Sequence, residues 1–188
     1  MGVEPAIANQ PTAADPVLDR IATGDHRGAL ELCARQHGDS IGRLCMALLG
    51  SQAEADETVQ EVLLAAYQAF PSYRADGTIR AFLFGIARKM CARRLETRVR
   101  RDRRLRLVHD AERDGGMPDH LADLRRQADR LRGALEELKP SERDAVVLRF
   151  ASGLSYREVA EACGIEEAAA RQRTSRALVR LRALLEEV

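Results

Sequence analysis

The sequence predicts an all-α protein made of two small helical domains that a flexible linker joins. Aromatic residues make up only 4% of the 188 residues and tryptophan is absent, so the core must consist mainly of Leu, Ala, Val and Ile. Valine and isoleucine do not alternate with polar residues over any useful length. No Asn-Gly or Asp-Gly pair joins two strand-like runs, so no hairpin is expected.

The chain is expected to begin with a disordered lead-in over residues 1–15, which has prolines and no hydrophobic period. From Pro16 an amphipathic helical pattern begins, with an interruption near Gly24. A second helix is expected over Ile41–Leu49, because Gly50 is a natural C-terminal cap. These elements open a first domain over residues 16–106.

The rest of the first domain is expected to hold two further helices. Ser51 and Glu54 form a capping-box pattern, and the helix that they open ends at Pro71. A long helix then begins near Ile79 and becomes increasingly arginine-rich. Glycines and a proline predict a flexible linker over residues 107–120.

The second domain, residues 121–188, is expected to contain four helices as well. The first runs over Leu121–Leu138, and Lys139-Pro140 breaks it. Ser141 is a good N-cap for the next helix, which should bury Phe150.

A helix-turn-helix is predicted at the end of the chain. Ser155 and Glu158 form a second capping box, and Gly164 allows the sharp corner before the last helix. The outer face of that helix carries side chains that can bond base edges or phosphates, namely Arg171, Gln172, Ser175 and Arg176. The alternative is a plain helical hairpin with solvated arginines.

Charge is unevenly distributed, although the formal net charge is only +1. Residues 51–70 contain acidic residues and no basic one, whereas residues 88–106 are rich in arginine. This segregation predicts two partners of opposite charge, one of them a nucleic acid. The acidic helix also carries an exposed leucine among its polar residues, which is typical of a docking surface for a basic protein helix: Asp56, Glu57, Gln60, Glu61 and Leu64. An ordinary solvated face is the alternative.

Aromatic residues lie just before the arginine-rich run. Proteins hold unpaired bases by stacking them on aromatic rings while arginines follow the backbone. Phe70 and Phe82 fall on the apolar stripe and are assigned mainly to packing, so Tyr73 is the better candidate for contact with a base.

Enzymatic and metal-binding functions are not expected. The four cysteines are scattered singly and have no zinc-ligand spacing, and P-loop, GxSxG and HExxH motifs are missing. We therefore predict no metal and no cofactor. Without a signal-like start or a long apolar run, the protein is expected to be cytoplasmic.

Two stretches resemble the extracytoplasmic-function (ECF) sigma factors of bacterial RNA polymerase. The stretch Ile41–Leu95, from "IGRLCMALLG" to "CARRL", looks like region 2, and Leu131–Leu185, from "LRGALEELKP" to "LRALL", looks like region 4. The resemblance implies a factor that binds core RNA polymerase and directs it to promoters. The largest-subunit clamp helices would meet the acidic helix, and the flap of the second subunit and an anti-sigma factor would be further partners.

The resemblance also implies DNA contacts. The loop from Tyr73 to Thr78 would receive a flipped base of the minus 10 element. The residues implied for minus 10 DNA are Tyr73, Arg74, Asp76, Thr78, Arg80, Arg88, Arg93 and Arg94. Those implied for the minus 35 element are Arg149, Tyr156, Arg171, Gln172, Ser175 and Arg176.

Some positions depart from the family pattern. Phe82 stands where tryptophan is usual, and Lys89 and Arg93 replace an expected Asn and Asp. Ala170 and Thr174 replace larger apolar residues, which predicts a less firmly anchored recognition helix. Two other functions remain open from the residues alone: a helix-turn-helix regulator that binds DNA without polymerase, and a helical adaptor that binds a protein.

Overall fold

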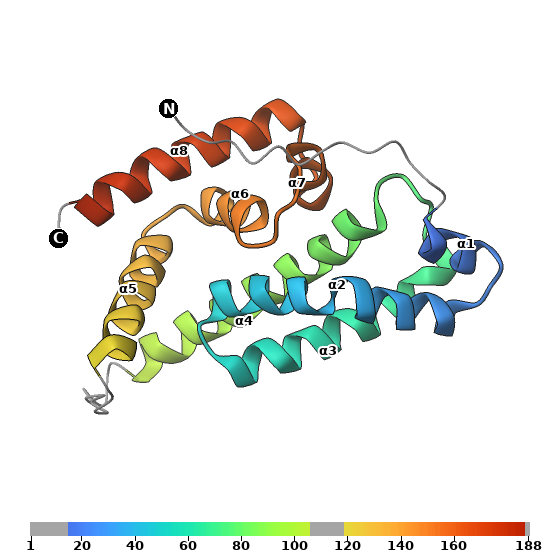
Figure 1. Cartoon of the computed structure of the whole chain (residues 1–188), viewed down its shortest axis with the longest axis horizontal. Coiled ribbons are helices and arrows are strands. Elements are labelled where there is room, and N and C mark those ends of the chain that lie inside the picture. The colour runs from blue at the N-terminus through green and yellow to red at the C-terminus, as the bar shows by residue number, and fades with distance from the viewer. Residues whose placement is uncertain (1–14, 106–118, 187–188) are drawn as a thin grey trace.

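The computed structural model describes residues 15–105 and 119–186, which form two helical units (Figure 1). The N-terminal unit contains α1 (Pro16–Ala22), α2 (His26–Leu49), α3 (Gln52–Ala69), the short 3₁₀ turn η1 (Phe70–Ser72) and α4 (Ile79–Leu105). The C-terminal unit contains α5 (Asp119–Glu136), α6 (Pro140–Phe150), α7 (Tyr156–Cys163) and α8 (Glu167–Glu186). No strand occurs in these ranges, so the all-α prediction is confirmed. The predicted lead-in and linker lie outside the described residues, except Asp15, Asp119 and His120.

The core of the N-terminal unit lies between α2, α3 and α4. Its largest fully buried side chains include Ile41, Leu44, Val62 and Phe84. Burying such side chains contributes about 1.5 to 3 kcal/mol each, which holds the three long helices together.

The expected start of a helix at Ile41 is wrong, because α2 is continuous from His26. The Asp25 carboxylate accepts the Gly28 N–H at 2.9 Å and caps the helix at its N-terminus. Gly38 lies inside the helix without breaking it. The predicted cap at Gly50 is confirmed, with a left-handed φ of 71° that glycine adopts without strain.

In the C-terminal unit, α6, α7 and α8 pack around Leu148, Leu154 and Val159, which are fully buried. The predicted capping box is present: the Ser155 hydroxyl accepts the Glu158 N–H at 3.2 Å, and the Glu158 carboxylate accepts the Ser155 N–H at 2.8 Å. Gly164 ends α7 with a φ of 66°, which makes the tight corner of the helix-turn-helix.

Two predictions for α6 are wrong. Its N-cap is Lys139, with Pro140 in the first turn, so Ser141 is already helical. Phe150 is 57% exposed, because it is the last residue of the helix and lies outside its buried face, which Ala145 and Leu148 form.

The two units touch through α4 and α7, and more weakly through α2 and α6. Among the described helices, none combines the length and apolar character needed to cross a membrane.

Candidate nucleic-acid and protein interfaces

The acidic face of α3 is exposed as predicted. Ala55, Val62 and Ala66 are fully buried on the opposite side of the helix. Leu64 is 58% exposed, so an apolar side chain lies in solvent among polar neighbours. The other exposed members of this face are Asp56, Glu57, Gln60 and Glu61.

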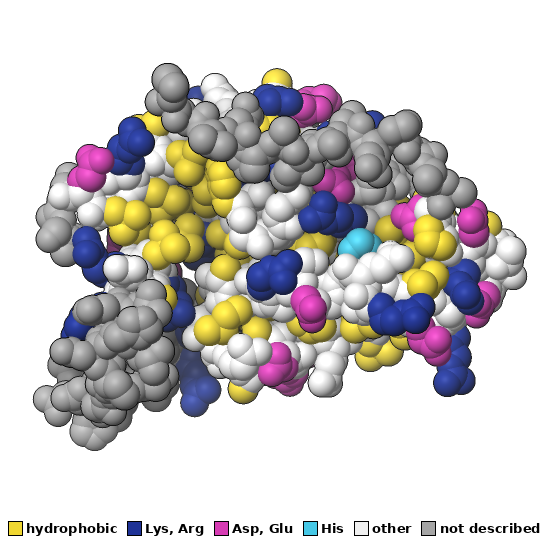
Figure 2. Space-filling view, viewed as in Figure 1, with side chains coloured by type: hydrophobic (Ala, Val, Ile, Leu, Met, Phe, Trp, Pro, Cys, Tyr) yellow, Lys and Arg dark blue, Asp and Glu magenta, His cyan; other side chains and the backbone are white. Residues whose placement is uncertain are grey.

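Acidic and basic helices that are separate in the sequence lie side by side in the fold. Arg94 of α4 bonds Glu57 and Glu61 of α3, each at 2.9 Å, and these bonds raise the pKa of the Arg94 guanidinium. Arg98 pairs with Glu54. These pairs border a groove of about 660 Å³ between the two helices. Part of the predicted charge segregation is therefore neutralised inside the unit, and Figure 2 shows basic and acidic side chains interspersed on one face of the molecule.

The loop between η1 and α4 holds Tyr73 half-buried. Its ring lies 4.8 Å from the Phe82 ring, and its hydroxyl donates to the Gly77 carbonyl at 3.0 Å. Burial raises the pKa of Tyr73 to about 12. Ala75 has a left-handed φ of 56°, a strained conformation for a residue with a Cβ. Arg74 and Asp76 extend into solvent from this loop.

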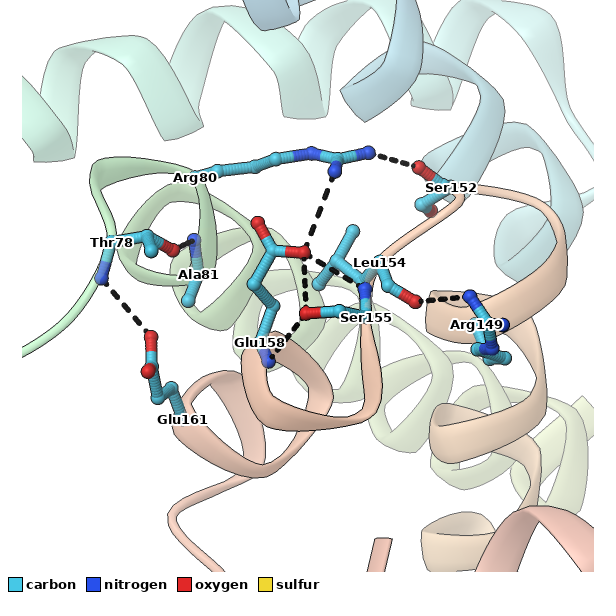
Figure 3. A network of polar contacts seen from close by, with 9 residues as sticks. All are labelled: Thr78, Arg80, Ala81, Arg149, Ser152, Leu154, Ser155, Glu158 and Glu161. Carbon is cyan, nitrogen blue, oxygen red and sulfur yellow. Dashed lines mark hydrogen bonds and ion pairs between the residues drawn. The ribbon is translucent and has the colours of Figure 1, made fainter. Parts of the chain in front are cut away.

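The remaining residues of the predicted minus 10 surface divide into two groups. Arg93 is exposed on α4, beside the paired Arg94. Thr78 and Arg80 instead contact the C-terminal unit, as Figure 3 shows. Arg88 also contacts that unit, through Asp144. The sequence therefore identified the basic residues of α4. In the fold, Arg93 is exposed to solvent, whereas Arg80 and Arg88 are covered by the C-terminal unit.

Helix α8, the predicted recognition helix, presents the four predicted side chains to solvent: Arg171, Gln172, Ser175 and Arg176. Ala170 and Thr174 are fully buried, and the Thr174 hydroxyl donates to the Ala170 carbonyl at 2.9 Å. These small residues therefore let α8 pack closely against its neighbours. The helix is held with its polar face outward.

Tyr156 contacts two of the predicted DNA-binding arginines. The Arg171 guanidinium lies 4.5 Å from the centre of its ring, and that of Arg149 lies 4.9 Å away. Arg171 also bonds Glu167 at 2.6 Å, and Arg149 donates to the Leu154 carbonyl at 2.9 Å. Cation–π contacts of this kind fix the direction of both guanidinium groups.

Sequence reasoning missed the acidic residues of the C-terminal unit that face α4. Asp144 bonds Arg88 at 3.0 Å, and burial raises the pKa of this carboxyl although Arg88 opposes the shift. Gly85, a glycine inside the long helix, was an available signal for close packing, because glycine is a poor helix former. In the described part of the chain, no cluster of His, Cys, Asp or Glu is arranged to hold a metal ion.

Comparison with known proteins identifies both units. The family model described as Sigma-70 region 2 matches residues 33–102, and the one described as Sigma-70, region 4 matches residues 128–181. The chain is 34% identical over 153 residues to the ECF RNA polymerase sigma factor EcfG of Rhodopseudomonas palustris (strain TIE-1), covering 78% of this chain and 79% of that protein. It is 34% identical over 188 residues to the ECF RNA polymerase sigma factor SigD of Mycobacterium tuberculosis (strain ATCC 25618 / H37Rv), covering 96% of this chain and 87% of the relative.

A solved structure has the same fold. It is the co-crystal structure of the sigma factor RpoE with the anti-sigma factor NepR from Bartonella quintana, and the likeness covers 86% of this chain and 97% of that chain. The TM-score is 0.61 at 27% sequence identity. With both regions matched and relatives aligned over most of their length, the chain belongs to the ECF RNA polymerase sigma factors, alternative sigma factors that direct promoter-specific transcription.

Proposed function

We propose that the two units divide promoter recognition between them, with residues 16–106 acting on the minus 10 element and residues 121–188 on the minus 35 element. Residues 107–120 connect them. In this proposal the polymerase catalyses RNA synthesis and the factor itself is not an enzyme. The factor would act in the cytoplasm, together with the polymerase. The observation that carries the proposal is the solvent-facing polar row of α8, held outward by buried Ala170, Thr174 and Ala177.

Recognition of the minus 35 element would use this row in the major groove. Arginine can form paired bonds with guanine, and glutamine can do so with adenine, so Arg171 and Gln172 are the candidates for base readout. The Tyr156 ring contacts the guanidinium groups of both Arg171 and Arg149, and it would hold them near the phosphate backbone, which Arg149 would contact. Ser175 and Arg176 extend the contact along the same helix.

Recognition of the minus 10 element would use the loop before α4. A flipped base needs an aromatic or apolar pocket, and the Tyr73–Phe82 ring pair borders this loop. Basic side chains of α4 would follow the strand. The residues proposed for this element are Tyr73, Arg74, Asp76, Thr78, Arg80, Arg88, Arg93 and Arg94.

Binding to core polymerase would use the exposed face of α3. Carboxylates around the exposed Leu64 complement a basic helix pair such as the clamp helices of the largest subunit. We propose that the flap of the second subunit covers exposed apolar side chains of the C-terminal unit, among them Leu178 and Val179 of α8. The complex of RpoE with NepR supports an anti-sigma factor as a further partner.

Run-off transcription with purified core polymerase tests this assignment. Promoters would first be selected from a random duplex pool by the wild-type holoenzyme. We expect a specific transcript that is lost when Asp56, Gln60 and Glu61 are replaced together by alanine. The matched control, Glu31→Ala, removes an exposed carboxylate of α2 and should transcribe normally.

A second variant, with Arg171 and Arg176 replaced by alanine, separates DNA reading from polymerase binding. It should still assemble with core polymerase but lose promoter specificity. Promoter DNA binding by the wild-type chain without any transcript would favour a helix-turn-helix regulator. Binding to neither DNA nor polymerase would favour an adaptor.

A further inference from the structure

Two buried thiols on neighbouring helices form a pair that neither promoter recognition nor polymerase binding uses. We propose that hydrogen peroxide oxidises Cys45 and Cys91 to a disulfide, which cross-links α2 to α4 inside the N-terminal unit. The pair is thus a modification site for a small, uncharged oxidant. This inference does not depend on the proposed function, because it concerns the core of one unit.

The two sulfur atoms are already in contact. The Cys91 thiol donates a hydrogen bond to the Cys45 sulfur, with 3.7 Å between the two sulfurs, although the residues are 46 positions apart in the sequence. Cys45 belongs to α2 and Cys91 to α4, and these helices lie side by side (Figure 1). A disulfide bond is about 2.05 Å long, so the sulfurs must approach by about 1.7 Å. Small rotations about the two Cα–Cβ bonds supply most of that movement.

The hydrogen bond gives the two thiols different roles. It lowers the pKa of the Cys45 thiol, and the Arg94 guanidinium lowers that pKa further, although burial opposes both effects. The same hydrogen bond raises the pKa of the Cys91 thiol, and burial adds to the rise. Because the thiolate is the nucleophile, Cys45 is the sulfur that attacks the peroxide. Cys91 is the sulfur that completes the disulfide.

The reaction proceeds in two steps. The Cys45 thiolate attacks one peroxide oxygen and the O–O bond breaks, which leaves a sulfenic acid on Cys45 and a hydroxide that takes up the proton released by the Cys45 thiol. The Cys91 sulfur then attacks the Cys45 sulfur, and the sulfenic oxygen leaves as water with the Cys91 proton. In all, two thiols lose two electrons and two protons, and one hydrogen peroxide becomes two waters.

Burial selects the oxidant. Both cysteine side chains are 0% exposed. The groove of about 660 Å³ between α3 and α4 is lined by Met90, the residue before Cys91, so small openings of the core there admit a molecule close to water in size. A bulky disulfide such as oxidised glutathione must instead place its own sulfur against the thiolate. We therefore expect peroxide to oxidise the pair and oxidised glutathione to leave it reduced.

Cys33 is an internal reference for the effect of pairing. It is also fully buried on α2, and of the four cysteines only Cys45 and Cys91 share a hydrogen bond. Burial raises the pKa of Cys33 to about 11, whereas the pKa of Cys45 lies below 9.0. At neutral pH Cys45 therefore holds about a hundredfold more thiolate, and its lower intrinsic nucleophilicity offsets about tenfold of this. Cys45 should react with peroxide about tenfold faster than Cys33.

The test treats the reduced full chain with a small molar excess of hydrogen peroxide at neutral pH. Free thiols are counted after denaturation, and cross-linked peptides are identified by mass spectrometry. We expect two of the four thiols to disappear and a peptide linked through Cys45 and Cys91 to form. The urea midpoint of unfolding, followed by circular dichroism, should rise by about 1 M or more, because the cross-link closes a loop that contains α3. Dithiothreitol should reverse the rise.

Two variants separate pairing from simple loss of a buried thiol. Cys91→Ala removes the resolving sulfur, so it should form no linked peptide and show no rise in the urea midpoint. Its Cys45 should stop at the sulfenic acid, which dimedone labels. Cys33→Ala is the matched control, because it removes a buried thiol outside the pair, and it should behave as wild type. If Cys91→Ala lacks a helical circular dichroism spectrum, the readings on wild type and Cys33→Ala decide alone.

Each outcome decides a separate point. Loss of thiols without a peptide linked through Cys45 and Cys91 overturns the proposal, and so does a linked peptide that forms only in urea. A linked peptide without a rise in the urea midpoint overturns cross-linking of the native core. Equal peroxide rates for Cys33 and Cys45 overturn the role given to the pair. Oxidation by glutathione disulfide as fast as by peroxide overturns the assigned oxidant.

Discussion

Replacing Tyr156 tests whether its ring prepares two arginines for DNA. In Tyr156→Leu, Arg171 and Arg149 lose the ring that their guanidinium groups contact at 4.5 Å and 4.9 Å. Both side chains then regain rotational freedom, which they must lose again on binding. We therefore expect weaker minus 35 binding, although Tyr156 makes no base contact in this proposal.

The magnitude follows from the anchors that remain. Immobilising a long side chain at an interface costs about 0.5 to 1.5 kcal/mol. Arg171 keeps its bond to Glu167, and Arg149 keeps its bond to the Leu154 carbonyl, so the lower value applies to each. The total is about 1 kcal/mol, which corresponds to about fivefold weaker binding.

The assay measures the dissociation constant of the holoenzyme for a selected promoter duplex by anisotropy at fixed salt. Tyr156→Phe is the matched control, because it keeps the ring and removes only the hydroxyl. It should bind within twofold of wild type. The reasoning is refuted if Tyr156→Leu also binds within twofold, or if Tyr156→Phe loses as much as Tyr156→Leu.

Three further predictions concern stability. Phe84→Ala should lower the free energy of unfolding in urea by about 3 to 5 kcal/mol, because the ring is fully buried, and a loss below about 1 kcal/mol would contradict this. Ser155→Ala should cost about 1 kcal/mol through loss of the cap, whereas Ser141→Ala should cost much less, and equal losses would argue against the observed caps. Burial raises the pKa of Cys33 from 9.0 to about 11, so the stability from its protonated thiol is complete below pH 9 and is lost as the pH rises through 11. The urea midpoint of unfolding should therefore fall between about pH 9 and pH 11. In Cys33→Ala this fall should be smaller, and a pH profile equal to that of wild type would contradict the link to the Cys33 thiol.

Local patterns predicted the elements of this fold well. The capping box at Ser155 and the glycine caps at Gly50 and Gly164 mark helix ends by short-range hydrogen bonding, and all three are present. The wrong prediction for Phe150 has a tertiary cause, since a helix period cannot show where the core ends. The continuity of α2 through Gly38 was missed because packing along a helix outweighs the weak preference of one residue.

The candidate surfaces were predictable only where they belong to one helix. The exposed faces of α3 and α8 follow from helical spacing. For this reason Leu64 and Arg171 were correctly predicted to be exposed. Contacts between distant segments leave no local pattern. Arg88 and Asp144 are 56 residues apart, and only the fold brings them together.

Some of the charges that the sequence separates into acidic and basic segments are paired within the fold. Glu57 and Glu61 neutralise Arg94 within the N-terminal unit, and Asp144 neutralises Arg88 between the units. A factor that acts together with a polymerase benefits from such pairing, because unpaired arginine surfaces bind any nucleic acid through salt-dependent phosphate contacts. If core polymerase engages the acidic face of α3, it withdraws carboxylates from Arg94 in the same step. Binding to the polymerase would then make α4 more available to DNA.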